Sequence, residues 1–249
     1  PRFPGEDFMK NCFLLLTALF VLTAADAFAW KIQIPAGYGQ GEFKDLTKEL
    51  GSAIAYRNLA PAEPLGITGF DIAAQTSAIS IDNNSSSWEK ATGADAPDYI
   101  TYPSLRVRKG LPFGIDIGVM YTDVYDTDIQ VYGAELSKAI LEGSVATPAL
   151  GVRATYSKLN GIDDFDLQTA GIDATISKGF LFLTPYAGGG MLWIDGKYNG
   201  SAASLSDESF WQSRGFIGLK ISPLPFVNIT AEAEYAVRPI YSLKLGIGF

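Results

Sequence analysis

The sequence predicts an all-β protein, a transmembrane antiparallel up-and-down β-barrel that follows a cleaved signal peptide. Three observations lead to this prediction. The last nine residues alternate strictly between apolar and small or polar side chains. Residues 9–29 have the layout of a secretion signal. The segments in between read as strands whose connections alternate between short and long, as in barrels that cross a membrane.

The carboxyl-terminal strand is the most informative stretch of the chain. Residues 241–249 read YSLKLGIGF, and their apolar members share one face of an extended strand. A terminal strand with a wholly apolar face would invite aggregation in a soluble domain. In a membrane barrel that face meets lipid, and closure of the sheet gives the strand a partner on each side. The apolar members are Tyr241, Leu243, Leu245, Ile247 and Phe249.

This ending resembles the terminal strand of Gram-negative outer-membrane β-barrels. The resemblance implies a location in the bacterial outer membrane, with membrane lipids and lipopolysaccharide around the barrel. It also implies that the barrel-assembly machinery reads the five apolar residues as an assembly signal that ends on Phe249. The motif is short and belongs to a broad class, so it indicates location and fold rather than activity.

A signal peptide is predicted over residues 9–29. Met9 and Lys10 open it, and an apolar stretch of about ten residues follows, too short for a membrane-spanning helix of about 20 residues. Ala27 and Ala29 supply the small residues of the cleavage site, so the mature chain would start at Trp30. Residues 1–8 precede the start methionine and are interpreted as an upstream extension.

Composition excludes several classes of protein. The chain contains no histidine, and its single cysteine, Cys12, lies inside the predicted signal peptide. The whole chain has 19 basic and 27 acidic residues, of which two basic and three acidic residues lie in 1–29. The predicted mature chain therefore has 17 basic and 24 acidic residues. This acidity argues against nucleic-acid binding, which requires a basic face. A secreted chain without a disulfide must be stabilised by burial or by a closed sheet.

Eleven strand-like segments can be read after the signal peptide. Bacterial barrels usually carry an even number of strands, so twelve is favoured, with the missing strand in residues 30–50. Ten would result if that N-terminal segment and residues 52–59 formed a plug instead. The barrel is accordingly assigned to residues 51–249. The eleven segments are 52–59, 66–81, 99–109, 113–124, 127–138, 146–158, 166–178, 181–195, 209–222, 226–237 and 240–249.

The connections alternate in length along the chain. Short periplasmic turns facing longer outer loops are expected of a membrane barrel. Counting back from Phe249, which would lie on the periplasmic side, places the short connections in the periplasm and the long polar ones outside. The short ones are 109–112, 178–179 and 222–225, and the long ones are 82–98, 159–165 and 195–208.

The polar face of each predicted strand must point into the lumen. A lysine or arginine on the lipid face near the membrane midplane costs about 2–4 kcal/mol. Six acidic and six basic residues on these faces are therefore predicted to line the lumen: Asp71, Arg106, Arg108, Asp116, Glu135, Arg153, Asp173, Arg214, Lys220, Glu232, Glu234 and Lys244.

Two functions remain open at this stage. The charges could line a small pore or passive transporter for polar solutes, or they could pair and close the lumen of a structural or surface-interaction barrel. No catalytic residues, cofactor or metal site are predicted. Glu232 and Glu234 are interpreted as paired lumen charges, and the aspartates at two loop tips as solvated turn residues rather than calcium ligands. These are Asp123, Asp126, Asp128, Asp163, Asp164 and Asp166.

Overall fold

The computed structural model describes residues 32–93, 96–124 and 127–249. The predicted signal peptide over 9–29, its cleavage residues Ala27 and Ala29, and the upstream extension over 1–8 lie outside the described residues and stay predictions. Within the described part of the chain, no helix is long and apolar enough to cross a membrane.

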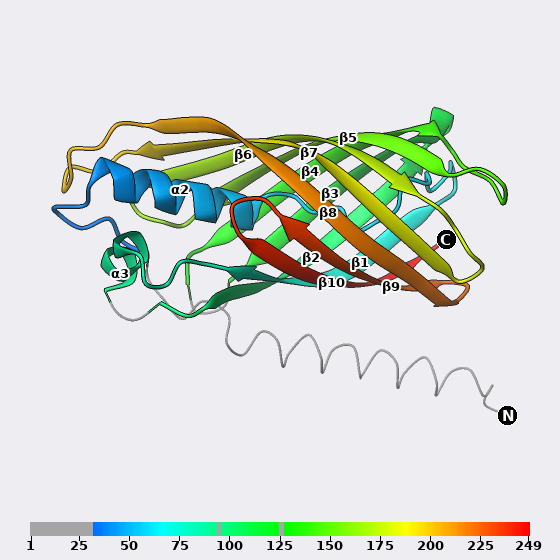
Figure 1. Ribbon diagram of the computed structural model, residues 1–249, viewed down its shortest axis with the longest axis horizontal. Coiled ribbons are helices and arrows are strands. Elements are labelled where there is room, and N and C mark those ends of the chain that lie inside the picture. The colour runs from blue at the N-terminus through cyan, green and yellow to red at the C-terminus, as the bar shows by residue number, and fades with distance from the viewer. Residues whose placement is uncertain (1–31, 94–95, 125–126) are drawn as a thin grey trace, which may run out of the picture.

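A closed antiparallel β-barrel makes up most of the structure (Figure 1). Consecutive strands pair with one another, and β1 also pairs with β10 to close the sheet. The predicted barrel is confirmed, with ten strands among the described residues. They are β1 (Phe70–Ser80), β2 (Tyr99–Leu111), β3 (Ile115–Asp123), β4 (Gln130–Leu141), β5 (Ala149–Asn160), β6 (Phe165–Ser177), β7 (Leu183–Tyr198), β8 (Glu208–Leu224), β9 (Val227–Tyr235) and β10 (Pro239–Gly248).

Side chains alternate between the lumen and the exterior along the wall. In β3, Ile117 and Val119 are exposed on the outside, while Asp116 and Gly118 are buried inside. This is the period-two arrangement of a strand, with an apolar outer face that suits lipid and a polar inner face. The same alternation runs through β4, β5 and β6.

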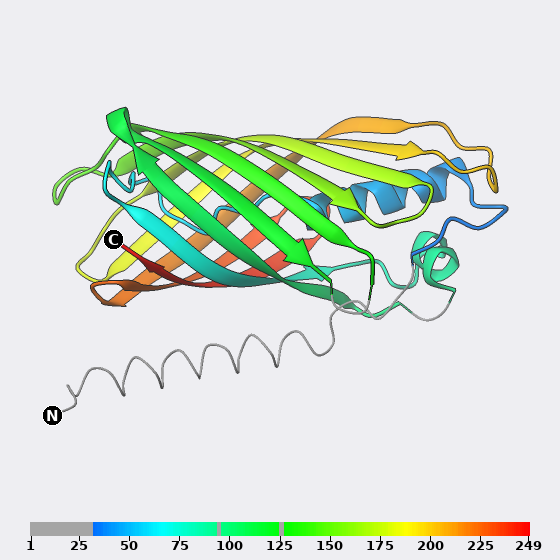
Figure 2. The ribbon, with the colours of Figure 1, turned by 180° about the vertical axis from the view of Figure 1, so that it is seen from behind.

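The two ends of the barrel differ (Figures 1 and 2). We call the end that holds Phe249 the turn end, because β2–β3, β6–β7 and β8–β9 are joined there by few residues. The opposite end is the loop end. It carries the connection between β1 and β2, which contains helix α3 (Ser86–Thr92), and the β7–β8 connection. The β4–β5 connection is an exception. It spans residues 142–148, longer than the other connections at this end, yet it also lies at the turn end.

The wall begins at Phe70, which corrects both the assignment of the barrel to residues 51–249 and the favoured count of twelve. Residues 40–54 form helix α2 (Gln40–Ile54), and residues 55–69 follow it without regular structure. Segment 52–59 alternates as a strand would, but β1 and β10 pair with each other and leave no free edge for it. We call residues 40–69 the plug, because the middle of this segment, residues 49–61, is buried within the barrel.

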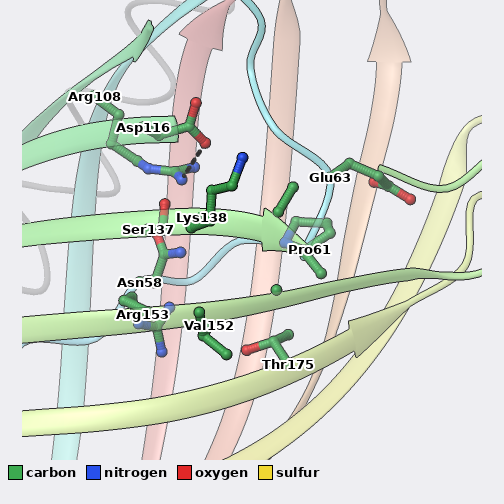
Figure 3. Close-up of a pocket in the computed structure, with 13 residues that line it drawn as sticks. Asn58, Pro61, Glu63, Arg108, Asp116, Ser137, Lys138, Val152, Arg153 and Thr175 are labelled. Atoms are coloured by element: carbon green, nitrogen blue, oxygen red, sulfur yellow. Dashed lines mark hydrogen bonds and ion pairs between the residues drawn. The ribbon is translucent and has the colours of Figure 1, made fainter. Parts of the chain in front are cut away.

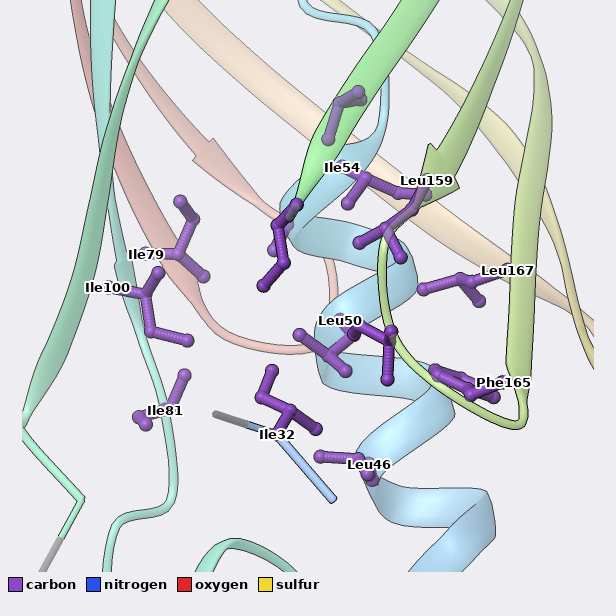
Figure 4. Close-up of a cluster of buried hydrophobic side chains, with 14 of the residues drawn as sticks. Ile32, Leu46, Leu50, Ile54, Ile79, Ile81, Ile100, Leu159, Phe165 and Leu167 are labelled. Atoms are coloured by element: carbon purple, nitrogen blue, oxygen red, sulfur yellow. The ribbon is translucent and has the colours of Figure 1, made fainter. Parts of the chain in front are cut away.

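The sequence of α2 explains why it is a helix inside a barrel. Phe43, Leu46, Leu50 and Ile54 recur at helical spacing and are buried on one face. This face packs against apolar side chains of the lumen wall in the loop half of the barrel (Figure 4). Gly51 permits a close approach, because a Cβ there would lie 2.4 Å from a side-chain carbon of Ile194 on β7.

Candidate functional site: the plugged lumen

The twelve charges predicted to line the lumen all lie on strands of the wall. Eleven of them are buried, and Lys220 is half-buried. Their partners could not be read from the sequence, because each partner lies on another strand or on the plug. The pairing decides whether these charges face water or one another.

Asp173 on β6 is the centre of one group of wall charges. The guanidinium of Arg214 on β8 donates to both carboxylate oxygens, one of them at 2.7 Å. Arg153 on β5 donates to the same carboxylate at 3.2 Å. Two cations thus share one buried anion, and the remaining charge is balanced by Glu234, whose carboxylate is 4.0 Å from Arg214.

Glu135 on β4 is the centre of a second group. It accepts hydrogen bonds from Arg106 at 3.2 Å and from Arg108, both on β2. Arg108 also donates to Asp116 on β3 at 3.1 Å. On the neighbouring strands, Lys244 on β10 pairs with Asp71 on β1 at 2.8 Å, and Asp71 lies directly across from Arg108 in the sheet. The wall therefore neutralises most of its charges by itself.

The plug adds polar contacts that the sequence did not reveal. Arg57 lies 3.5 Å from Glu234 and also donates to carbonyl oxygens at the end of α2. Tyr56 accepts from Arg106 at 2.9 Å through its hydroxyl, and its carbonyl accepts from Arg214 at 3.2 Å. Arg57 and Tyr56 thereby connect the plug to both groups of wall charges. The sequence offered one signal for this role, an arginine within the otherwise mostly apolar segment 52–59.

The loop half of the lumen is apolar. Leu167 and Phe165 on β6, Leu192 and Ile194 on β7, and Ile240 on β10 are all buried there against α2. Phe43 of α2 meets Phe165 edge-on, with ring centroids 5.4 Å apart. A water-filled channel would not bury apolar side chains on its inner wall, so this half of the lumen is shaped to hold the helix.

Helix α3 and its flanking residues close the loop end as a cap. Trp88 is fully buried and donates from its indole nitrogen to Glu49 of α2 at 2.6 Å. Glu49 also accepts from Arg238, in the β9–β10 connection, at 3.0 Å, and Arg238 reaches Asp82 at 2.6 Å. These contacts join α2, the β1–β2 connection and the β9–β10 connection, so the helix is fixed at its outer end as well as inside.

The cap predicts an effect of strongly acidic pH. Lys90 and the backbone N–H of Gly39 lower the pKa of the Glu42 carboxyl from 4.5 to about 2. A group with a depressed pKa stabilises the fold above its unfolded pKa, and this contribution is lost as the pH falls through its folded pKa. We expect acrylamide quenching of Trp88 to increase between pH 4.5 and about 2, in a variant whose other tryptophans are Phe.

The matched control for this titration is Glu42→Gln in the same background. In the Glu42–Lys90 pair, Lys90 is exposed and Glu42 half-buried, so the effect of the pair on stability is modest. The Gln variant should show little pH dependence of quenching over the same interval. If its quenching rises as steeply as that of the parent, another carboxylate controls the cap.

A small pocket lies between the plug and the wall near the turn end (Figure 3). Asn58 and Glu63 of the plug line it together with Arg108, Lys138 and Arg153 of the wall. Arg108 and Arg153 already have carboxylate partners, and the lining carries charges of both signs. This arrangement indicates a polar seam between plug and wall rather than a binding site for one charged ligand.

Glu232 and Glu234 have separate partners. Glu232 accepts from the hydroxyl of Tyr186 on β7 at 2.7 Å, and Glu234 faces Arg57 and Arg214. Among the described residues, no group of three or more acidic, histidine or cysteine side chains is arranged to hold a metal ion. Asp123, Asp128, Asp163, Asp164 and Asp166 lie at the loop end, exposed, and Asp126 is outside the described residues.

The predicted assembly signal lies on the closing strand. Tyr241, Leu243 and Ile247 are exposed on the outer face of β10, and Leu245 is half-buried there. Phe249 exchanges two backbone hydrogen bonds with Phe70, at 2.8 and 3.0 Å, and their rings meet edge-on at 4.4 Å. Phe249 thus completes the seam between the last strand and the first.

No family model and no curated protein matches the chain. Solved outer-membrane barrels are similar in fold. The outer membrane protein OprG from Pseudomonas aeruginosa is 10% identical, with 75% of this chain and 99% of OprG covered and a TM-score of 0.36. Ail from Yersinia pestis is 16% identical, with 73% and 99% covered and a TM-score of 0.34. The KdgM porin is 8% identical, with the same coverage and TM-score as Ail. Such likeness assigns no residue a role.

Proposed function

We propose that the protein is a non-enzymatic outer-membrane barrel whose lumen is closed by its own plug and whose loop end is its working surface. The observation that supports this proposal best is the apolar contact between α2 and the loop half of the lumen wall. Removing the helix would expose the buried Leu167, Leu192 and Ile194 to water. Exposing apolar surface costs about 25 cal/mol per Å², so a lumen of this kind favours a resident helix over passing solute.

The turn half of the lumen supports the same proposal by different chemistry. Its charges are buried and paired, with Arg214 and Arg153 on Asp173 and with Arg106 and Arg108 on Glu135. A charge in a water-filled channel stays hydrated and keeps much of its surface exposed. Paired and buried charges close a lumen, because each partner replaces the water that the other has lost.

The loop end would face the lipopolysaccharide layer and the medium in this orientation. Exposed aspartates such as Asp128, Asp163 and Asp166 give this face an acidic character. These aspartates repel anionic partners. We therefore expect partners that carry positive charge, or divalent cations that bridge the aspartates to lipopolysaccharide phosphates. The barrel-assembly machinery is the other proposed partner, through Phe249.

A small pore for polar solutes is the second candidate. The observation that favours it is that the wall balances its six acids and six bases without the plug, in pairs such as Arg108–Asp116, Arg153–Asp173 and Lys244–Asp71. If the plug left the lumen, the wall would keep most of these pairs.

Planar-bilayer recording separates the two candidates. We expect the purified full-length protein to insert without reproducible single-channel steps, since α2 and residues 55–69 fill the lumen. A variant that lacks residues 40–65 is the matched comparison, provided that it still shifts in gel mobility on heating, and it should conduct. Reproducible steps from the full-length protein would contradict the proposed closed lumen and favour the pore.

A further inference from the structure

The amino-terminal part of the described chain lies at the loop end. The backbone N–H of Gln33 donates to the carbonyl of Ala91 at 2.8 Å, and the hydroxyl of Tyr38 donates to the carbonyl of Ser87 at 2.6 Å. Both acceptors belong to α3, which is part of the cap. Ile32 and Ile34 are buried in the same apolar cluster. Residues 32–39 are therefore held on the cap and do not return to the turn end.

The segment that follows ends at the opposite side of the barrel. The backbone N–H of Phe70 donates to the carbonyl of Phe249 at 2.8 Å, and Gly110 donates to Gly69 at 3.0 Å. These residues lie at the turn end, where β1 begins and β10 finishes. Between residues 39 and 70 the chain has thus passed from one end of the barrel to the other.

The route between the two ends runs through the lumen. Tyr56 contacts Arg106, the backbone N–H of Ala62 donates to the Ser177 hydroxyl at 3.0 Å, and that of Leu65 donates to Asp116 at 3.1 Å. The three wall partners are buried inward-facing residues of β2, β6 and β3. All three lie in the turn half of the barrel, so the chain from Tyr56 to Leu65 runs inside the wall.

The enclosed chain cannot leave sideways, because the β1–β10 seam is paired continuously from Asp71–Gly248 to Ile79–Ile240. Nor is it free to slide. The apolar face of α2 fixes it in the loop half, and Arg57 and Tyr56 fix it in the turn half. The barrel must therefore close around a segment whose amino-terminal side has already reached the loop end.

We propose that the barrel carries its own amino-terminal segment through the lumen and displays residues 32–39 on the outer face of the cell. The inference rests on the orientation in the proposed function, with the loop end outside. Display of this segment is a function distinct from solute transport, and it uses the closed lumen as an anchor.

The displayed segment contains an exposed tight turn. Pro35, Ala36 and Gly37 are exposed, the N–H of Tyr38 donates to the carbonyl of Pro35 at 3.1 Å, and Gly37 has a φ of 85°. Nothing in the described structure covers Ala36, so a cysteine there reports the side of the membrane without disturbing the plug.

Cysteine labelling on intact cells tests the inference. The only natural cysteine, Cys12, is replaced by serine, and single cysteines are introduced as Ala36→Cys, Ser201→Cys or Val145→Cys. Ser201 is exposed in the β7–β8 connection at the loop end, and Val145 is fully exposed in the β4–β5 connection at the turn end. The probe is a large charged maleimide that does not cross the outer membrane, applied before and after permeabilisation.

We expect Ala36→Cys and Ser201→Cys to be labelled to the same extent before and after permeabilisation, and Val145→Cys only after it. If Ser201→Cys is labelled on intact cells but Ala36→Cys is not, the display of residues 32–39 is overturned while the orientation stands. If Val145→Cys is labelled on intact cells and Ser201→Cys is protected, the orientation is inverted. In that case the proposed function of the loop end fails together with the display.

Discussion

Deletion of Phe249 is expected to abolish most of the heat-modifiable, membrane-embedded protein while the signal peptide is still removed. The deletion takes away two backbone hydrogen bonds to Phe70, each worth about 1 kcal/mol. It also removes the edge-on ring pair with Phe70, worth about 0.5–1.5 kcal/mol. Both losses fall on the seam that closes the barrel, and the proposed recognition by the assembly machinery is lost with them. The measurement is the fraction of membrane protein whose gel mobility shifts on heating.

Phe226→Ala is the matched control for this deletion. Phe226 is an exposed aromatic residue at the turn end whose ring centroid is 6.5 Å from that of Phe249, and the substitution keeps the backbone hydrogen bond that its carbonyl accepts from Gly248. It should assemble far better than the deletion. Equal yields from the two variants would remove the special role of the carboxyl-terminal residue.

Lys244 is not a suitable control, although it lies on the same strand. A mild effect of Lys244→Gln would require a watery lumen face. The side chain is instead buried beside Asp71 at 2.8 Å. Its loss would leave a buried carboxylate with only the Asn228 amide as a partner.

Asp173→Asn is expected to be the most destabilising single substitution in the lumen. The carboxylate accepts from Arg214 and Arg153, and all three side chains are buried. Removing one partner of a buried ionic group typically costs about 3–5 kcal/mol, because the remaining charge stays dehydrated and unpaired. We expect a large fall in the urea concentration at which the detergent-solubilised barrel unfolds, followed by the loss of its heat-dependent gel shift.

Asp45→Asn makes the same chemical change at an exposed site. Asp45 lies 3.6 Å from Lys48 on α2, and its side chain is 65% exposed. Exposed ion pairs contribute about 0–1 kcal/mol, so this variant should unfold at nearly the parental urea concentration. Similar midpoints for Asp45→Asn and Asp173→Asn would show that water reaches the Asp173 group, which would favour the pore over the closed lumen.

Local pattern was sufficient to predict the ten strands of the wall. Segments such as 113–124 and 146–158 alternate with period two, and the structure has β3 and β5 there. The physical reason is that lipid outside and a polar lumen inside impose opposite chemistry on successive side chains. The same rule placed the twelve charges on inward faces, because a charge on the lipid side is costly wherever it occurs in the sequence.

Local pattern could not decide the state of residues 52–59. Ile54 and Tyr56 alternate with small residues as in a strand, yet Ile54 ends α2 and Tyr56 lies in the irregular part of the plug. A strand needs a free edge to pair with, and the edge disappears when Phe70–Ser80 meets Pro239–Gly248. Whether that edge exists is a property of the closed sheet and not of the segment.

The sequence by itself determined the barrel, its lipid-facing surface, the inward direction of its charges and the closing role expected of its last strand. Each of these follows from the alternation of neighbouring residues. Only the tertiary structure decided that the lumen is filled, that Arg57 meets Glu234 across 177 positions of the chain, and that the amino-terminal segment lies at the loop end. These features depend on which distant strands closure brings together around the plug, and no local periodicity encodes that.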